Sequence, residues 1–137
     1  MAPFRSQEEL DTMEDFEIIS AYSREQALED GVLVDITKTA KEAGVKFHTA
    51  MTSAAYADCV TWSQKSAMQD ESGRLWDVAY MFSRAALRSK GSHITFSLYR
   101  VPNTPRSRNA KPVTLKAVIG PGDNLEPVIT IMLPSES

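Results

Sequence analysis

The segment from Gln69 to Gly91 constrains the fold more than any other part of the sequence, because it has the full pattern of one amphipathic helix. Asp70 is a suitable N-cap, and Gly91 can end the helix in the left-handed C′ conformation. The pattern therefore predicts a long helix that buries one face against the rest of the chain. That face comprises the apolar residues that recur at intervals of three and four, namely Leu75, Val78, Ala79, Phe82, Ala85 and Ala86.

After this helix the hydrophobic pattern changes to the two-residue period of a strand. Apolar residues alternate with mainly polar ones over 94–99 and again over 113–119, and residues 128–133 are apolar except for Thr130, as in a strand covered on both faces. Turn-forming residues separate the three runs. The pattern predicts an antiparallel meander of three strands, to which the β-branched run VLVDI, residues 32–36, would add a fourth.

The part of the chain before the long helix has the pattern of short helices with recognisable caps. Ser23 and Gln26 form a capping-box pattern, and Thr37 is a candidate cap of the next helix. Residues 45–51 have no clear period and fit either a helix or a strand. Helices are predicted over residues 24–30, 38–43 and 53–68.

Length and charge place these elements in one domain. At 137 residues the chain has the size of a single domain with its own core. Residues 1–15 are acidic and lack a hydrophobic period, which indicates a flexible arm, so the domain is predicted to span residues 16–137. The expected fold is a single α+β domain, with helices packed on one face of a three- to four-stranded antiparallel sheet.

The sequence favours a soluble, cytoplasmic protein. Its N-terminal segment has no apolar core of a secretory signal, and no run approaches the roughly 18 apolar residues needed to span a bilayer. Cys59 is the only cysteine, which excludes an internal disulfide and suits a reducing compartment. No membrane contact is therefore expected.

The charges are segregated along the chain, although its net charge is only −3. Residues 1–31 hold nine acids and two bases, whereas residues 84–116 hold eight bases and no acid. Clustered cations beside aromatic rings fit the phosphates and bases of nucleic acid, and Arg and Tyr are also favoured at protein interfaces. The candidate contact residues for a protein partner or nucleic acid are Arg84, Arg88, Tyr99, Arg100, Arg106, Arg108, Lys111 and Lys116.

The acidic N-terminal arm offers a second mode of contact. Its carboxylates could imitate a nucleic-acid backbone and occupy a basic groove on another protein. The alternatives are that the arm only keeps the protein in solution, and that the basic segment is solvated and offset by the arm. Residue types alone leave these alternatives open.

No group of residues has the spacing of an enzyme or metal site. Cys59 could form a nucleophilic pair with His48 or His93, but its position within a predicted helix favours a buried core thiol. Two histidines 45 residues apart and one cysteine do not have metal-ligand spacing, so no metal and no cofactor are expected.

The acidic residues around the long helix have structural explanations. Asp70 is predicted to cap the helix, and Glu71 to pair with Arg74 three residues later, although a general acid or a divalent-ion site could also use these carboxylates and Asp77. The GPGD run at 120–123 is predicted to be a turn between strands, because it lacks the lysine and the following helix of a phosphate-binding loop.

Five blocks of the sequence, in order, resemble a family of small bacterial proteins of unknown function that occur on plasmids, integrative elements and phages. Together they cover about residues 18–134, and His48 stands where the family pattern would have a proline. The resemblance implies no activity. It implies that the gene lies on mobile DNA, where genes for counter-defence proteins are common. The blocks are YSREQALEDGVLVDIT, TSAAYADCVTW, QDESGRLWDVAYM, FSLYRV and GPGDNLEPVITIMLP.

The sequence therefore leads to three functional hypotheses. The first is a non-catalytic, stoichiometric inhibitor of host defence, of the anti-CRISPR or anti-restriction type, that binds a host protein or nucleoprotein complex. The second is a nucleic-acid-binding accessory protein that uses the basic segment 84–116. The third is an enzyme that uses Cys59 or the carboxylates. The identity of the partner and the oligomeric state stay open.

Overall fold

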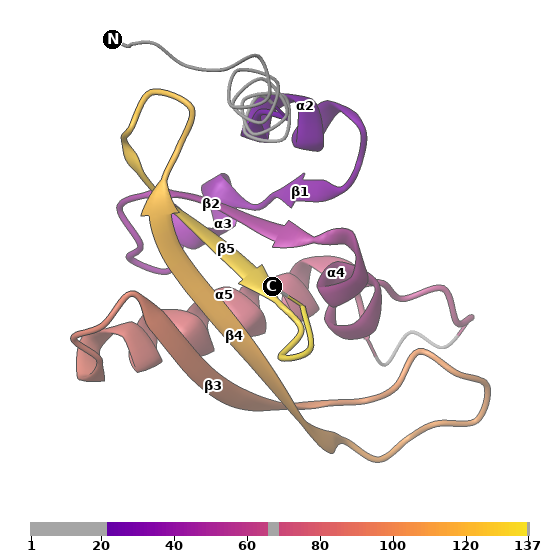
Figure 1. Ribbon diagram of the computed structural model, residues 1–137. Helices are drawn as coiled ribbons and strands as arrows, with labels where there is room; N and C mark the ends of the chain where they lie inside the picture. Colours follow the sequence, from indigo (N-terminus) through magenta and orange to yellow (C-terminus); the bar gives the residue numbers. More distant parts are fainter. Residues whose placement is uncertain (1–21, 66–68, 137) are drawn as a thin grey trace, which may run out of the picture.

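The structure, a computed structural model, describes residues 22–65 and 69–136, so the predicted acidic arm over residues 1–15 lies outside the described residues. The described part forms one α+β unit around a five-stranded sheet (Figure 1). Four helices are described: α2 (Arg24–Glu29), α3 (Thr37–Glu42), α4 (Ser53–Cys59) and α5 (Glu71–Arg88). The strands are β1 (Leu33–Asp35), β2 (His48–Thr52), β3 (His93–Arg100), β4 (Lys111–Pro121) and β5 (Pro127–Met132).

The sheet is mixed, and the prediction of a three- to four-stranded antiparallel sheet was wrong on this point. Its order is β1-β2-β5-β4-β3, and β2 pairs with β5 in parallel. The meander of β3, β4 and β5 and the strand over VLVDI are confirmed, since these strands pair antiparallel as predicted. The additional strand is β2, which came from the ambiguous residues 45–51; three of its five residues are buried in a row, so it shows no two-residue alternation.

The helices lie on both faces of the sheet, which corrects the expectation that they share one. Helices α3, α4 and α5 pack over the face that buries Phe96, Leu115 and Ile131. Helix α2 reaches the opposite face, because Arg24 donates from Nη1 to Thr130 Oγ1 over 2.7 Å, and Thr130 alternates with the buried Ile131. Hereafter these are the inner and the outer face.

Helix α5 and the inner face of β3 form the centre of the core. Val78, Ala79 and Phe82 are buried as the helical period predicted, and the Phe82 ring lies 5.8 Å from the ring of Phe96 between centroids. Burying a side chain of the size of Val78 or Phe82 contributes about 1.5–3 kcal/mol each. The inner face of β3 alternates with a solvent-exposed outer face along the whole strand.

Several local signals act as the sequence predicted. Ser23 and Gln26 form both hydrogen bonds of the capping box, and the Asp70 side chain accepts from the amide of Gly73 over 2.6 Å. Gly31 and Gly44 end their helices with φ of +76° and +98°, conformations that favour glycine.

Other end signals were wrong. Thr37 is the first residue of α3 rather than its cap, and the Asp35 carboxylate accepts from the amide and hydroxyl of Thr37 instead. Helix α5 ends at Arg88 with an extended Ser89, so Gly91 does not supply a left-handed C′ residue. No helix in the described part of the chain is long and apolar enough to cross a membrane.

Candidate partner-binding surfaces

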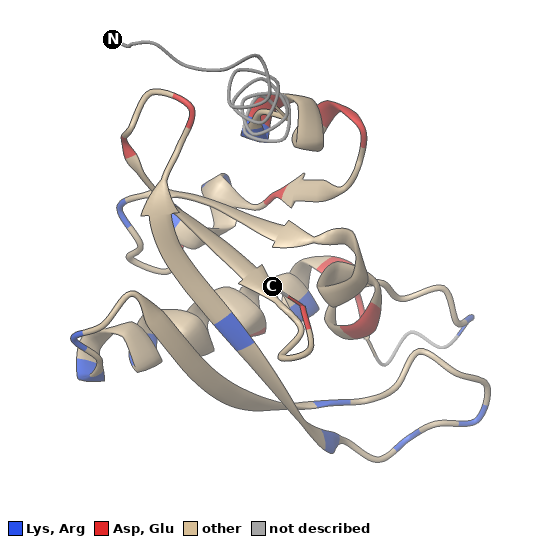
Figure 2. Ribbon diagram, in the orientation of Figure 1, with Lys and Arg blue, Asp and Glu red and all other residues tan. Residues whose placement is uncertain are grey.

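The predicted basic segment does not form one surface. Arg84 and Arg88 lie toward the C-terminal end of α5, whereas Arg106 and Arg108 lie in the loop between β3 and β4, beside the N-terminal half of the helix (Figure 2). Eighteen helical residues span about 27 Å at 1.5 Å per residue. The loop and the end of α5 therefore make two separate basic regions, while Lys116 lies between them on β4.

Arg100 lies inside the protein, although the sequence offered it as a surface cation. Its exposed fraction is 5%, and its Nη2 donates to Asp77 Oδ2 over 2.6 Å. Its Nη1 donates to the carbonyls of Cys59 and Arg74 at 3.2 Å, and its Nε to the carbonyl of Tyr99 at 2.8 Å. This guanidinium joins α4, α5 and β3 and does not face a partner.

Arg74 is a second buried guanidinium, and sequence reasoning missed it. Its exposed fraction is 1%; Nε donates to the carbonyl of Val60 at 3.0 Å, and Nη1 to the carbonyl of Val101 at 2.9 Å. Burial, followed by the neighbouring charge of Arg100, lowers the pKa of Arg74, yet an arginine remains charged in proteins. The predicted partner Glu71 instead accepts from the amide of Trp62.

These two guanidiniums explain why α4 ends at Cys59, so the helix predicted over 53–68 does not continue through residues 60–65, and its last residues, 66–68, lie outside the described residues. In a longer helix the carbonyls of Cys59 and Val60 would accept from amides four residues later. Arg100 and Arg74 donate to those carbonyls instead, and the amide of Ser63 donates to Asn103 Oδ1 at 3.0 Å. The chain therefore leaves the helix and runs toward the β3–β4 loop.

The exposed side of α5 carries two aromatic rings, those of Trp76 and Tyr80. We call this surface the α5 ledge, and it comprises Trp76, Tyr80, Met81, Arg84 and Leu87. The Trp76 and Tyr80 rings stack with centroids 6.1 Å apart, and the Arg84 guanidinium lies 5.9 Å from the Tyr80 ring. Residues four apart share a helix face, so the three make one strip. Leu87 extends it and is 81% exposed. Of the ledge, the sequence singled out only Arg84.

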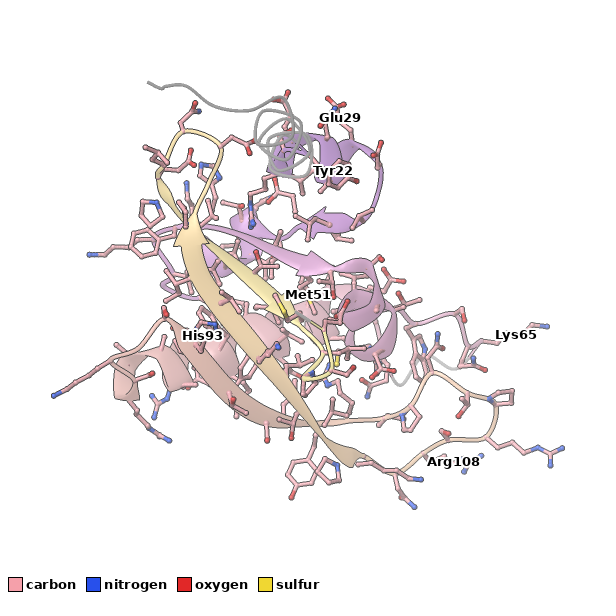
Figure 3. All side chains as sticks on the ribbon, viewed as in Figure 1. Tyr22, Glu29, Met51, Lys65, His93 and Arg108 are labelled. Atoms are coloured by element: carbon pink, nitrogen blue, oxygen red, sulfur yellow. The ribbon has the colours of Figure 1, made fainter. Side chains whose placement is uncertain are left out.

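A second surface lies at the other end of the molecule, and we call it the loop groove. It is a hollow of about 770 Å³ lined by Trp62, Lys65, Arg106 and Arg108 among others. Asn103 holds its two walls together, because its side chain hydrogen-bonds with Ser63 and Gln64. Figure 3 shows Lys65 and Arg108 projecting outward at this end. The sequence pointed to Arg106 and Arg108 but not to Lys65 or Trp62.

The remaining predicted contact residues lie between or beside these surfaces. Tyr99 is 70% exposed on the outer face of β3. Lys111 is exposed at the start of β4, paired in register with Arg100, and Lys116 is half-buried in the same strand. The structure therefore brings Arg106 and Arg108 together, and Arg84 and Arg88 together, but not all eight residues.

The residues weighed for catalysis are not brought together. Cys59 is fully buried in the core under the inner face, and burial, followed by the charge of Asp58, raises the pKa of its thiol to about 11. His48 and His93 are exposed, and their strand registers place both on the outer face. Within residues 22–65 and 69–136 no cluster of His, Cys, Asp and Glu could hold a metal ion.

The turn between β4 and β5 begins later than predicted, because Gly120 and Pro121 of the GPGD run belong to β4, and its Asp123 has a role that the sequence did not reveal. Asp123 accepts from the amides of Arg24 and Glu25, at 2.9 and 3.1 Å, and so caps the first turn of α2 from the β4–β5 hairpin. Asp123 comes 99 residues after Arg24, so no local capping pattern could indicate this contact.

Comparison with known proteins identifies one relationship. The model of a family of unknown function (DUF6573) matches residues 10–137. No curated protein and no solved structure matches the chain.

Proposed function

The chain belongs to a family of unknown function (DUF6573), and from this premise we propose that it is a non-catalytic, stoichiometric protein-binding protein whose main contact is the α5 ledge. The observation that supports the proposal is the stacked strip of Trp76, Tyr80 and Arg84 on the exposed side of a long helix. Trp, Tyr and Arg are the residues most enriched at interface hot spots.

The arrangement of this strip supports a protein partner more than simple solvation. The rings are held by their mutual stacking and by Arg84, so little side-chain entropy remains to be lost on binding. Leu87 adds apolar area beside them that solvation does not require. Flanking cations favour a partner with an acidic rim.

For the biological role, we propose inhibition of a host defence complex. The support is the resemblance to small proteins of plasmids, integrative elements and phages, where an inhibitor acts by occupying its target without turnover. On this proposal the target is a protein or nucleoprotein complex of the host, and the protein works inside the cell.

A test compares two matched surface substitutions. Leu87→Glu places a charge on the ledge, and Leu125→Glu makes the same change on an equally exposed leucine, 84% exposed, in the β4–β5 hairpin. We expect purification from host cells to recover a partner with the wild type and with Leu125→Glu, and its dissociation constant to rise about tenfold or more with Leu87→Glu. Tyr80→Ala should have a comparable effect.

Both leucines are exposed, so neither substitution should change the free energy of unfolding by more than about 0.5 kcal/mol. Thermal unfolding of each variant checks this. Two results would contradict the proposal that the ledge is the contact. One is that the wild type recovers no partner, and the other is that both glutamate variants lose the same amount of partner affinity.

The second candidate function is nucleic-acid binding at the loop groove. The observation that favours it is the gathering of Lys65, Arg106 and Arg108 around Trp62, from two segments about 40 residues apart. Cations beside an aromatic ring are the elements of a single-strand site, since the cations contact phosphates and the ring stacks on a base.

A further inference from the structure

Strand β3 is an edge strand of eight residues. In the described part of the chain it pairs only with β4, so its other side faces no strand. A long edge exposes unpaired amides and carbonyls, and proteins normally shorten it, charge it or cover it. Helix α5 runs beside this edge, since residues of α5 and β3 line the same two hollows.

The register shows which backbone groups face the free edge. The amide of Ile119 donates to the carbonyl of Ser92 at 2.8 Å, which makes that pair a hydrogen-bonded one. Hydrogen-bonded pairs alternate in an antiparallel ladder, so Ile94, Phe96, Leu98 and Arg100 also bond to β4. The free groups are the amides and carbonyls of the residues between, His93, Thr95, Ser97 and Tyr99.

A groove runs beside this edge along the whole strand. One hollow lies along the first half of β3 and a second along the second half, and both include Tyr80, Met81 and Ser97. The flank of α5 forms the floor, with Met81 in the middle and Arg84 and Arg88 toward the His93 end. At the opposite end of the groove, the Asp77 carboxylate forms an ion pair with Arg100.

We propose that β3 binds an extended, acidic segment of the partner protein, which adds a sixth strand to the sheet. This inference rests on the proposed function and names how the partner is held. An added strand would bond to the free amides and carbonyls of β3, and its alternate side chains would point down onto α5.

The floor of the groove defines the chemistry of that segment. A side chain over Met81 and Tyr80 would be apolar, and one over Arg84 and Arg88 would be Asp or Glu. The alternation of backbone donors and acceptors on β3 matches a peptide. A nucleic-acid backbone offers mainly acceptors, so it does not match this edge.

The experiment uses a displayed library of random twelve-residue peptides, selected on the full-length protein. We expect enrichment of peptides in which Asp or Glu and β-branched or apolar residues alternate. The dissociation constant of a synthetic enriched peptide should rise at least tenfold with Thr95→Pro, which removes one free amide, and stay within about twofold with Thr95→Ala, which keeps it.

A second variant tests the same site without touching the backbone. Arg88→Glu should raise the dissociation constant of the peptide at least tenfold, and the difference in affinity from the wild type should shrink at high salt. Lys65→Glu makes the same charge change at the loop groove and should leave peptide affinity within about twofold. Circular dichroism and thermal unfolding confirm that each variant is folded.

Other outcomes would overturn the proposal. These are no enrichment of acidic peptides, unchanged binding by both Thr95→Pro and Arg88→Glu, or a concentration-dependent dimer that Thr95→Pro abolishes, which would make a second copy the occupant. Failure here is distinguishable from failure of the proposed function. If Leu87→Glu weakens partner capture and Thr95→Pro does not, the ledge is the contact and the added strand at β3 is rejected.

Discussion

At the scale of residues, Arg74 and Arg100 occupy positions in their elements that indicate burial. Arg74 stands four residues before Val78 and eight before Phe82, so its helical phase placed it on the buried stripe. Arg100 continues the alternation of Ile94, Phe96 and Leu98. Periodicity could therefore have predicted both burials. Residue type indicated exposure instead, because arginines are rarely buried unless their donors find acceptors. Most of these acceptors, including the carbonyls of Val60 and Cys59 and the carboxylate of Asp77, come from other segments of the chain.

Cys59 provides a prediction at this scale, against the hypothesis of a thiol enzyme. Its raised pKa, about 11, and its burial should leave it unmodified by thiol reagents at neutral pH in the folded state and reactive after denaturation. Cys59→Ala should cost about 1 kcal/mol of unfolding free energy through lost packing. Measurements are the rate of labelling with a chromogenic disulfide reagent and urea denaturation.

The pH dependence of stability follows from the same shift. Burial raises the pKa of the Cys59 thiol above its ordinary value of 9.0, so the folded state holds the thiol proton more tightly than the unfolded chain. The contribution of Cys59 is therefore complete below pH 9 and is lost as the pH rises toward 11. Rapid labelling of the native protein would contradict the core role.

At the scale of elements, the sequence predicted those with a strong local pattern. Helix α5 and strands β3 and β4 follow from the 3.6- and 2-residue periods, and β5 follows from its apolar run between turn-forming residues, with ends within a few residues. Strand β2 could not be predicted, since its parallel partner β5 comes some 80 residues later and burial on both faces removes the alternation. The length of α4 was missed because side chains from outside the segment occupy its last carbonyls.

Helix α2 gives the prediction that belongs to this scale. It has only six residues, so its position depends on tertiary contacts more than on propensity. Asp123→Ala removes the acceptor for the amides of Arg24 and Glu25 and should cost about 1 kcal/mol. Asn124→Ala, at the neighbouring exposed position of the hairpin, is the matched control and should cost less than about 0.5 kcal/mol.

The measurements are urea denaturation and hydrogen exchange of the α2 amides. Faster exchange in α2 with Asp123→Ala, and little change elsewhere, is expected because the cap joins one short helix to one hairpin. Equal effects of the two variants would show that Asp123 does not hold the helix.

At the scale of the whole molecule, the segregation of charge along the chain becomes a separation in space. Acidic residues gather around α2 and the β4–β5 hairpin and near α4, whereas basic residues lie on several elements, including α3, β4, the β3–β4 loop and the end of α5 (Figure 2). The sequence indicated the excess of base over residues 84–116. It could not indicate that these basic residues would lie in separate regions of the surface, because their positions depend on how α5 packs against β3.

Nucleic-acid binding at the loop groove is the prediction for this scale. A labelled single-stranded oligonucleotide should bind at about 50 mM salt, and its affinity should fall steeply as salt is added. Replacing Lys65, Arg106 and Arg108 by Ala should reduce the slope of log affinity against log salt by ~0.7 for each lost phosphate contact. Arg84→Ala with Arg88→Ala is the control at the other basic region and should leave the slope unchanged.

Fluorescence anisotropy over a salt series gives the slope. The second candidate function is contradicted if the wild type does not bind at low salt, or if the control pair of substitutions lowers the slope as much as the groove variants do.

The buried arginines have a consequence for how the two surfaces act together. Arg74 lies against Trp62 of the loop groove and holds the start of the β3–β4 loop through Val101, while its own helix presents Trp76 two residues later. A ligand that displaced Trp62, and Arg74 with it, would also displace the helical turn that carries the stacked rings. Any change in affinity that this produced at the rings would be reciprocal, so a partner bound to the rings would change the affinity at the loop by the same factor.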